Sequence, residues 1–149
     1  MYPAKYKITL RITHPSMDPE DISTQLGLQA SRRWSAGSRR TTPTGTLLSG
    51  VNDVTFCMFE LEVPMEMIGD LGSALSLWTK KLFAAKSFFD HIRSTGGTIE
   101  YFIGVFMEKG NTGVVMEVSL MTQLVELGID LSLDIYESQH VEQEATQHT

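Results

Sequence analysis

Arginine is the residue type in this sequence that is best suited to binding chemistry. Four arginines and a tryptophan lie between residues 31 and 45, a stretch without Asp or Glu. The planar guanidinium group binds carboxylates and phosphates through paired hydrogen bonds, and it stacks on aromatic rings. We therefore predict a site for a protein partner or an anion, formed by Arg32, Arg33, Trp34, Arg39 and Arg40.

The charge of the rest of the chain sets this basic segment apart. The whole chain has a net charge of −6 and residues 31–45 carry +4, so the remainder carries −10. This acidity argues against broad nucleic-acid binding but is compatible with a local anion site. Trp34 is expected to anchor the loop by packing its ring on the sheet, with the arginines flanking it. The alternative is structural: one or two arginines pair with acids such as Asp53 or Asp134, and the others are solvated.

Catalysis has weaker support, because a nucleophile needs a base beside it. Cys57 is the single cysteine and lies in an apolar run, which predicts a buried core residue. His14 is near several carboxylates in sequence, but a polar loop residue is the preferred interpretation. Glu60 and Glu62 share one face of a strand and are expected to be solvated. We predict no catalytic residue.

The sequence lacks the motifs that are typical of several other classes of protein. No HxxxH, CxxC, acidic calcium loop or glycine-rich phosphate loop is present, so we expect no metal and no cofactor. No apolar run is long enough to span a membrane, and the N-terminus lacks the apolar core of a signal peptide. With one cysteine, a reducing cytoplasm is the expected compartment.

The periodicity of apolar residues predicts the elements that position these side chains. Residues 6–13 alternate as a half-buried strand. Asp18, Pro19 and Gly27 have the types expected at the start and end of a short helix. Strands are expected over 54–63, 99–107, 114–118 and 131–136. A long helix is expected over 71–95, and a second one is expected between Ser119 as N-cap and Gly128.

The order β-α-β-α-β-β-α-β predicts an α+β fold with a mainly antiparallel sheet and helices on one face. Residues 1–136 are expected to form one domain, with a long loop over 29–53 and a polar tail over 137–149. Asp18, Leu26, Gly27 and Leu28 recur as Ser119, Leu127, Gly128 and Ile129, 101 residues later. This similarity reflects either the capping residues that short helices have in common or a ferredoxin-like pseudo-repeat.

Two segments carry a resemblance to a known family. The first is DPEDISTQLGLQASRRWSAG, through Asp18, Pro19, Ile22, Leu26, Gly27 and Leu28. The second is VSLMTQLVELGIDLSLDIY, through Leu124, Leu127, Gly128, Leu133, Asp134, Ile135 and Tyr136. Together they resemble the bacterial family known as domain of unknown function 4279, over roughly residues 6–136. Ala30 stands where that family tends to have proline, and the tryptophan often found ahead of the second strand is absent.

The resemblance implies an α+β fold in a cytoplasmic bacterial protein, sometimes encoded near toxin–immunity or other accessory loci. Our first hypothesis is a non-enzymatic interaction protein whose partner surface is the basic loop. The alternative is a small-anion or nucleotide-binding sensor, and the third is an unrecognised hydrolase using His14. Homodimerisation through an exposed strand edge, such as that of residues 99–107, is a further expectation.

Overall fold

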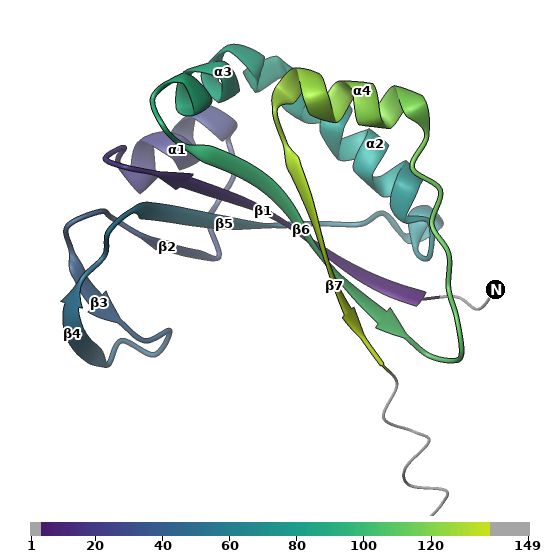
Figure 1. Ribbon diagram of the computed structural model, residues 1–149, viewed down its shortest axis with the longest axis horizontal. Coiled ribbons are helices and arrows are strands. Elements are labelled where there is room, and N and C mark those ends of the chain that lie inside the picture. Colours follow the sequence, from purple (N-terminus) through teal and green to yellow (C-terminus); the bar gives the residue numbers. More distant parts are fainter. Residues whose placement is uncertain (1–3, 138–149) are drawn as a thin grey trace, which may run out of the picture.

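Strands with alternating apolar side chains form the main sheet of the protein (Figure 1). The computed structural model describes residues 4–137. The main sheet has the strand order β2-β5-β1-β6-β7, and β3 and β4 form a separate hairpin. The strands are β1 (Ala4–His14), β2 (Arg32–Trp34), β3 (Arg39–Thr41), β4 (Leu47–Val51), β5 (Thr55–Leu61), β6 (Thr98–Met107) and β7 (Asp130–Tyr136).

The helices cover one face of this sheet (Figure 1). They are α1 (Pro19–Leu26), α2 (Leu71–Leu82), α3 (Lys86–Ser94) and α4 (Val118–Leu127), with short 3-10 turns at η1 (Met65–Met67) and η2 (Phe83–Ala85). The core lies between the helices and the sheet, where Leu10, Phe59 and Tyr101 meet Leu75 and Phe89. This arrangement confirms the predicted α+β class.

The pairing of the strands shows how the two halves of the chain differ. β1 is antiparallel to both β5 and β6, whereas β7 is parallel to β6 and follows it through α4. A ferredoxin-like repeat would place another strand between the two strands of such a βαβ unit. The predicted similarity is therefore limited to the helix ends, where Gly27 and Gly128 have φ values of 64° and 68°.

The predicted start of α1 is confirmed, and that of α4 is wrong. Asp18 caps α1 by accepting a hydrogen bond from the backbone N–H of Glu20, with Pro19 as the first residue. α4 begins two residues earlier than predicted, with Glu117 as N-cap and without a capping side-chain bond. Ser119 therefore lies inside the first turn of α4.

The predicted long helix over 71–95 is two helices joined by η2. Its apolar stripe recurs every seven residues, whereas an ideal helix completes two turns in 7.2 residues. Such a stripe drifts by about 20° per heptad around a straight helix. The 3-10 turn at Phe83–Ala85 interrupts the helix, and Leu75 before it and Ile92 after it are both buried.

The strand predicted over 114–118 is absent. Residues 108–117 connect the end of β6 to the start of α4, and Val115 in this segment is 77% exposed. The β-branched residues of this segment have no neighbouring strand to pair with. Their composition was typical of a strand, but a strand also needs a partner.

The segment predicted as a loop over 29–53 contains β2, β3 and β4. Each of these strands is short, and the residues of β3 and β4 are all exposed, so no apolar alternation marked them. The predicted tail over 137–149 lies outside the described residues except for Glu137.

Candidate functional site

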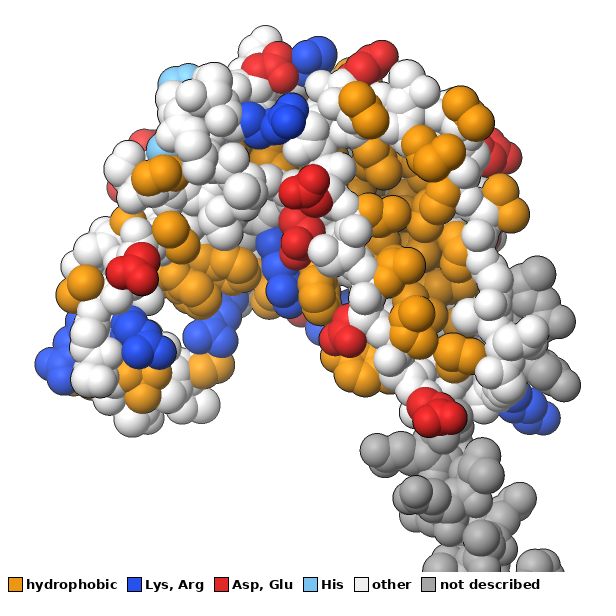
Figure 2. All heavy atoms as spheres, in the orientation of Figure 1, with side chains coloured by type: hydrophobic (Ala, Val, Ile, Leu, Met, Phe, Trp, Pro, Cys, Tyr) orange, Lys and Arg blue, Asp and Glu red, His pale blue; other side chains and the backbone are white. Residues whose placement is uncertain are grey.

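The face of the sheet opposite the helices carries the residues that sequence analysis singled out. In β1 the even-numbered residues Ile8, Leu10 and Ile12 are buried under the helices, so the odd-numbered residues face the other way. The register then places Arg11 beside Met58 of β5 and Glu100 of β6. We call this surface the uncovered face. Figure 2 shows that it is hollowed between the β3–β4 hairpin and the far end of β7.

Arg32, Trp34 and Phe56 form a stack at the β2 end of the uncovered face. Trp34 lies opposite Phe56 in the register, and their ring centroids are 4.4 Å apart with an interplanar angle of 21°. The Arg32 Cζ atom lies 5.0 Å from the centroid of the Trp34 ring, within the range of a cation–π interaction. Trp34 thus packs on the sheet as predicted, and its ring contacts both Phe56 and Arg32.

β2 is held in this position by hydrogen bonds at both of its ends. The backbone N–H of Ser31 donates to the carbonyl of Met58 at 2.8 Å, and the Ser31 hydroxyl donates to the same oxygen at 3.1 Å. After β2, the N–H of Ala36 donates to Oγ1 of the buried Thr55. The tryptophan ring is therefore carried by a strand that is fixed on either side of it.

A second arginine lies on an aromatic ring near the middle of the uncovered face. The Arg11 Cζ atom is 3.7 Å from the centroid of the Phe102 ring. Its Nε atom is buried and has no hydrogen-bond partner among the described residues. Further along, Phe106 and Tyr136 stack with their centroids 5.0 Å apart. Sequence analysis predicted a half-buried strand over residues 6–13 but did not connect Arg11 with these aromatic residues.

Arg33 lies on the opposite side of β2 from Arg32. In the register it faces Cys57, whose side chain points into the core, and its guanidinium group forms an ion pair with Glu20 of α1. Arg33 therefore pairs with an acid, as the structural alternative predicted. Its partner is Glu20 instead of Asp53 or Asp134. The two halves of the Arg32–Arg33 pair face different surroundings.

Arg39 and Arg40 belong to the β3–β4 hairpin. Arg39 Nε donates to the carbonyl of Leu48 and Arg40 Nη1 to that of Ser49, each at 3.3 Å. Both side chains are exposed and form no ion pair with any residue between 4 and 137. The hairpin extends away from the sheet at the β2 end (Figure 1), and Figure 2 shows basic side chains on it.

The electrostatics of the uncovered face change along its length. At the β2 end Arg32 has no acidic partner in the described part of the chain. Lys7 of β1 is paired with Glu60 at 3.3 Å. Towards β7, Glu100 accepts a hydrogen bond from Ser132, and Asp134 accepts one from Tyr136, which together with the Asp134 charge raises the pKa of that tyrosine. Among residues 4–137, the arginines without an ion pair on or beside this face are thus Arg11 near its middle, Arg32 at the β2 end, and Arg39 and Arg40 on the hairpin.

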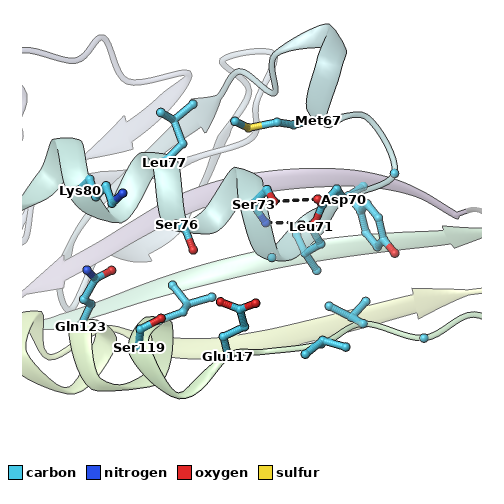
Figure 3. Close-up of a pocket in the computed structure, with 17 residues that line it drawn as sticks. Met67, Asp70, Leu71, Ser73, Ser76, Leu77, Lys80, Glu117, Ser119 and Gln123 are labelled. Carbon is cyan, nitrogen blue, oxygen red and sulfur yellow. Dashed lines mark hydrogen bonds between the residues drawn. The ribbon is translucent and has the colours of Figure 1, made fainter.

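A polar cleft of about 640 Å³ lies elsewhere, between the first turns of α2 and α4 (Figure 3). Asp70 accepts hydrogen bonds from the backbone N–H and the hydroxyl of Ser73, and these bonds lower the pKa of its carboxyl group. Glu117, the N-cap of α4, and Ser119 and Gln123 of α4 line the opposite side of the cleft. The Asp70–Ser73 contact is a helix cap, and no histidine or cysteine among residues 4–137 lines the cleft. Most of its residues come from segments that sequence analysis assigned to a helix over 71–95, a strand over 114–118 and a helix after Ser119, without a functional role.

A comparison with models of protein families identifies the family of the chain. The sequence model of the family described as Domain of unknown function (DUF4279) matches residues 4–138. The chain belongs to the DUF4279 family. The match includes both segments that carried the resemblance, which confirms it. Neither a search of curated proteins nor a search of solved structures found a match.

His14 and Cys57 of this DUF4279 domain are both buried. His14 ends β1: its Nδ1 accepts hydrogen bonds from the N–H groups of Ser16 and Met17, and its Nε2 lies 2.7 Å from the Thr95 hydroxyl. Burial, assisted by His91, lowers the pKa of His14. Burial also raises the pKa of the Cys57 thiol to about 11, which disfavours the nucleophilic thiolate. The prediction that Cys57 is a core residue is confirmed.

Two further properties of the DUF4279 domain concern metals and membranes. Among residues 4–137, no group of three His, Cys, Asp or Glu side chains is arranged to hold a metal ion. Within the same residues, no helix combines the length and the apolar character required to cross a bilayer.

Proposed function

We propose that this protein is a non-enzymatic interaction module, of an accessory or immunity type, that binds an acidic segment of another protein on its uncovered face. The observation that carries the proposal is the Arg32–Trp34–Phe56 stack. The stack lies on a face without covering helices, and Arg32 has no acidic partner within residues 4–137. Aromatic residues and arginine are the types enriched at protein interfaces.

The distribution of the arginines favours an extended partner over a small anion. A phosphate or nucleotide site needs several donors that converge on one point. Arg33 instead lies on the helix side with Glu20, and Arg39 and Arg40 lie on a hairpin beside the sheet. A polypeptide segment with several carboxylates can contact Arg32 and the hairpin together. Stacking on Trp34 also limits the conformational freedom that Arg32 loses on binding.

Arg32 and Arg33 provide a matched test, because they are neighbours and differ in the face they occupy. The protein is immobilised and used to capture partners from an extract of its source cell. We expect Arg32→Gln to weaken binding of the partner at least tenfold, since a charge-assisted hydrogen bond contributes roughly 1.5–3 kcal/mol. Arg33→Gln removes the same charge and breaks only a surface ion pair, so its capture is expected to equal that of the wild type.

The competing anion-sensor function is tested with inorganic phosphate and a panel of nucleotides. The proposal predicts that none of them raises the melting temperature. A rise that disappears in Arg39→Gln would favour the sensor and contradict the proposal. Equal loss of captured partner in Arg32→Gln and Arg33→Gln would also contradict it, because the uncovered face would then have no special role.

A further inference from the structure

β7 has a free edge in the described structure. The strand expected to be exposed, residues 99–107, is β6, and it lies inside the sheet between β1 and β7. The edges of the sheet are instead formed by β2, with three residues, and β7, with seven. Proteins protect long edges with Pro, Lys or bulges. β7 contains neither Pro nor Lys, and its register with β6 is regular over Glu100–Phe106.

An apolar surface adjoins this edge. Leu131, Leu133 and Ile135 share one face of β7 and are 38%, 51% and 61% exposed. α4 contributes a second exposed row, formed by Val118, Met121 and Val125, which are spaced by three and four residues along the helix. Figure 2 shows hydrophobic side chains gathered over α4 and beside β7. A contiguous apolar patch of this kind marks an interaction surface.

We propose that two copies of this chain form a dimer through antiparallel pairing of β7 with β7, centred on Leu133. The two-fold axis stands perpendicular to the sheet and joins the two sheets into one of ten strands. Such an axis keeps each face of the sheet on the same side in both copies, so each residue opposes a residue of its own face. Because the inference rests on the edge and its apolar row, it is independent of the proposed partner binding.

The sequence of β7 is complementary to itself in this register. On the helix side, Leu133 opposes Leu133 of the other copy, and Leu131 opposes Ile135. On the uncovered face, Asp134 opposes Ser132, and Asp130 opposes Tyr136, so each acid meets a hydroxyl group. Cross-strand apolar pairs stabilise a sheet, whereas like charges placed directly opposite one another destabilise it.

The neighbouring registers lack this complementarity. Centring the pair on Ser132 places Asp130 opposite Asp134, and centring it on Asp134 places that carboxylate opposite its own copy. Shifts by a single residue oppose side chains from different faces, which the two-fold axis forbids. Charge and hydrophobicity therefore select a second copy as the occupant of this edge, and they select Leu133 as the centre.

The first test is sedimentation velocity of the full chain over a dilution series. We expect a dimer that dissociates on dilution. Leu133→Asp places two carboxylates opposite each other and is expected to raise the concentration for half-dissociation at least tenfold. Met65→Asp is the matched control, because Met65 is 85% exposed in η1 and lies outside the proposed interface. A monomeric wild type at every concentration, or a Leu133→Asp variant that dimerises like the control, would overturn the proposal.

The register is tested by oxidative cross-linking. This experiment still tests the dimer if the Leu133→Asp variant fails to fold. Opposed residues of antiparallel strands have Cα atoms about 4.5–5.5 Å apart, which suits a disulfide. Leu133→Cys should therefore form a dimer under mild oxidation, and the buried Cys57 should not react. Ser132→Cys lies diagonally from its copy, at about 7–8 Å, and should cross-link poorly. Equal cross-linking of both variants, or none in Leu133→Cys, would contradict the pairing.

Discussion

His14 fixes the end of β1 through both of its ring nitrogens. Nδ1 accepts from the N–H groups of Ser16 and Met17 at 3.0 and 2.9 Å, so it carries no proton. Thr95 uses its own hydroxyl proton on the carbonyls of His91 and Ile92, and Nε2 is then the donor to the Thr95 oxygen. The geometry requires the neutral ring, in agreement with the lowered pKa.

This geometry predicts a pH dependence of stability. Because the pKa of His14 is lower in the folded state than its ordinary 6.5, the unfolded chain binds a proton first as the pH falls. The contribution of neutral His14 is complete above pH 6.5 and is lost as the pH falls towards the folded pKa. In urea unfolding, the free energy of unfolding of His14→Asn should fall less than that of the wild type between pH 7 and pH 5.5. Identical pH profiles would exclude this role for His14.

At the scale of elements, α1 and α4 end in the same way but in different surroundings. Gly27 and Gly128 both adopt the left-handed conformation, and their N–H groups bond to carbonyls of the preceding turn. A Cβ at Gly27 would meet nothing within 4 Å, whereas one at Gly128 would overlap the guanidinium group of Arg93. Substitutions at these two glycines therefore distinguish the effect of backbone strain from the effect of steric crowding.

Alanine substitutions measure these two effects. Gly27→Ala is expected to lower the free energy of unfolding by about 1–2 kcal/mol, the cost of a left-handed non-glycine residue. Gly128→Ala should cost more, because Arg93 must also move. The double variant Gly128→Ala/Arg93→Ala should have a smaller loss, relative to Arg93→Ala, than Gly128→Ala has relative to the wild type. Equal losses for Gly27→Ala and Gly128→Ala in chemical denaturation would show that Arg93 does not matter.

The elements that sequence analysis predicted well are those with a buried face. β1 alternates between apolar and polar residues over 6–13, β5 and β6 are largely apolar runs, and α1 carries its own start and stop signals. The hairpin of β3 and β4 has no buried residue to set a period, and β2 has only three residues. The segment at 114–118 has strand composition, but the fold provides no neighbouring strand.

The candidate site could be predicted only in part, because its geometry depends on pairing between strands that are far apart in the sequence. A basic segment with one tryptophan indicated where to look, but it could not show that Arg32 and Arg33 face opposite ways. That division follows from the pairing of β2 with β5, a contact between segments about 25 residues apart. Arg11 and Phe102 are 91 residues apart in the chain and meet only through the pairing of β1 with β6.

At the scale of the whole molecule, the sheet has two faces and two edges with different properties. One face is covered by helices, and the other is hollowed and carries unpaired arginines near β2. The β7 edge, at the far side, carries apolar residues and aspartates. In the proposed dimer the two uncovered faces lie on the same side of a joined sheet. The arginine-rich ends point outward in that arrangement, so dimerisation leaves the proposed binding face free.

Partner binding on the uncovered face is tested most directly with the two tryptophans. Trp34 lies on that face, and Trp78 lies on α2 with its indole N–H donating to the carbonyl of Glu62 at 2.7 Å. Acrylamide quenching is measured in Trp78→Phe and Trp34→Phe, with and without the captured partner. We predict that the partner protects Trp34 and leaves Trp78 unchanged. Protection of Trp78 with unchanged quenching of Trp34 would contradict binding on this face.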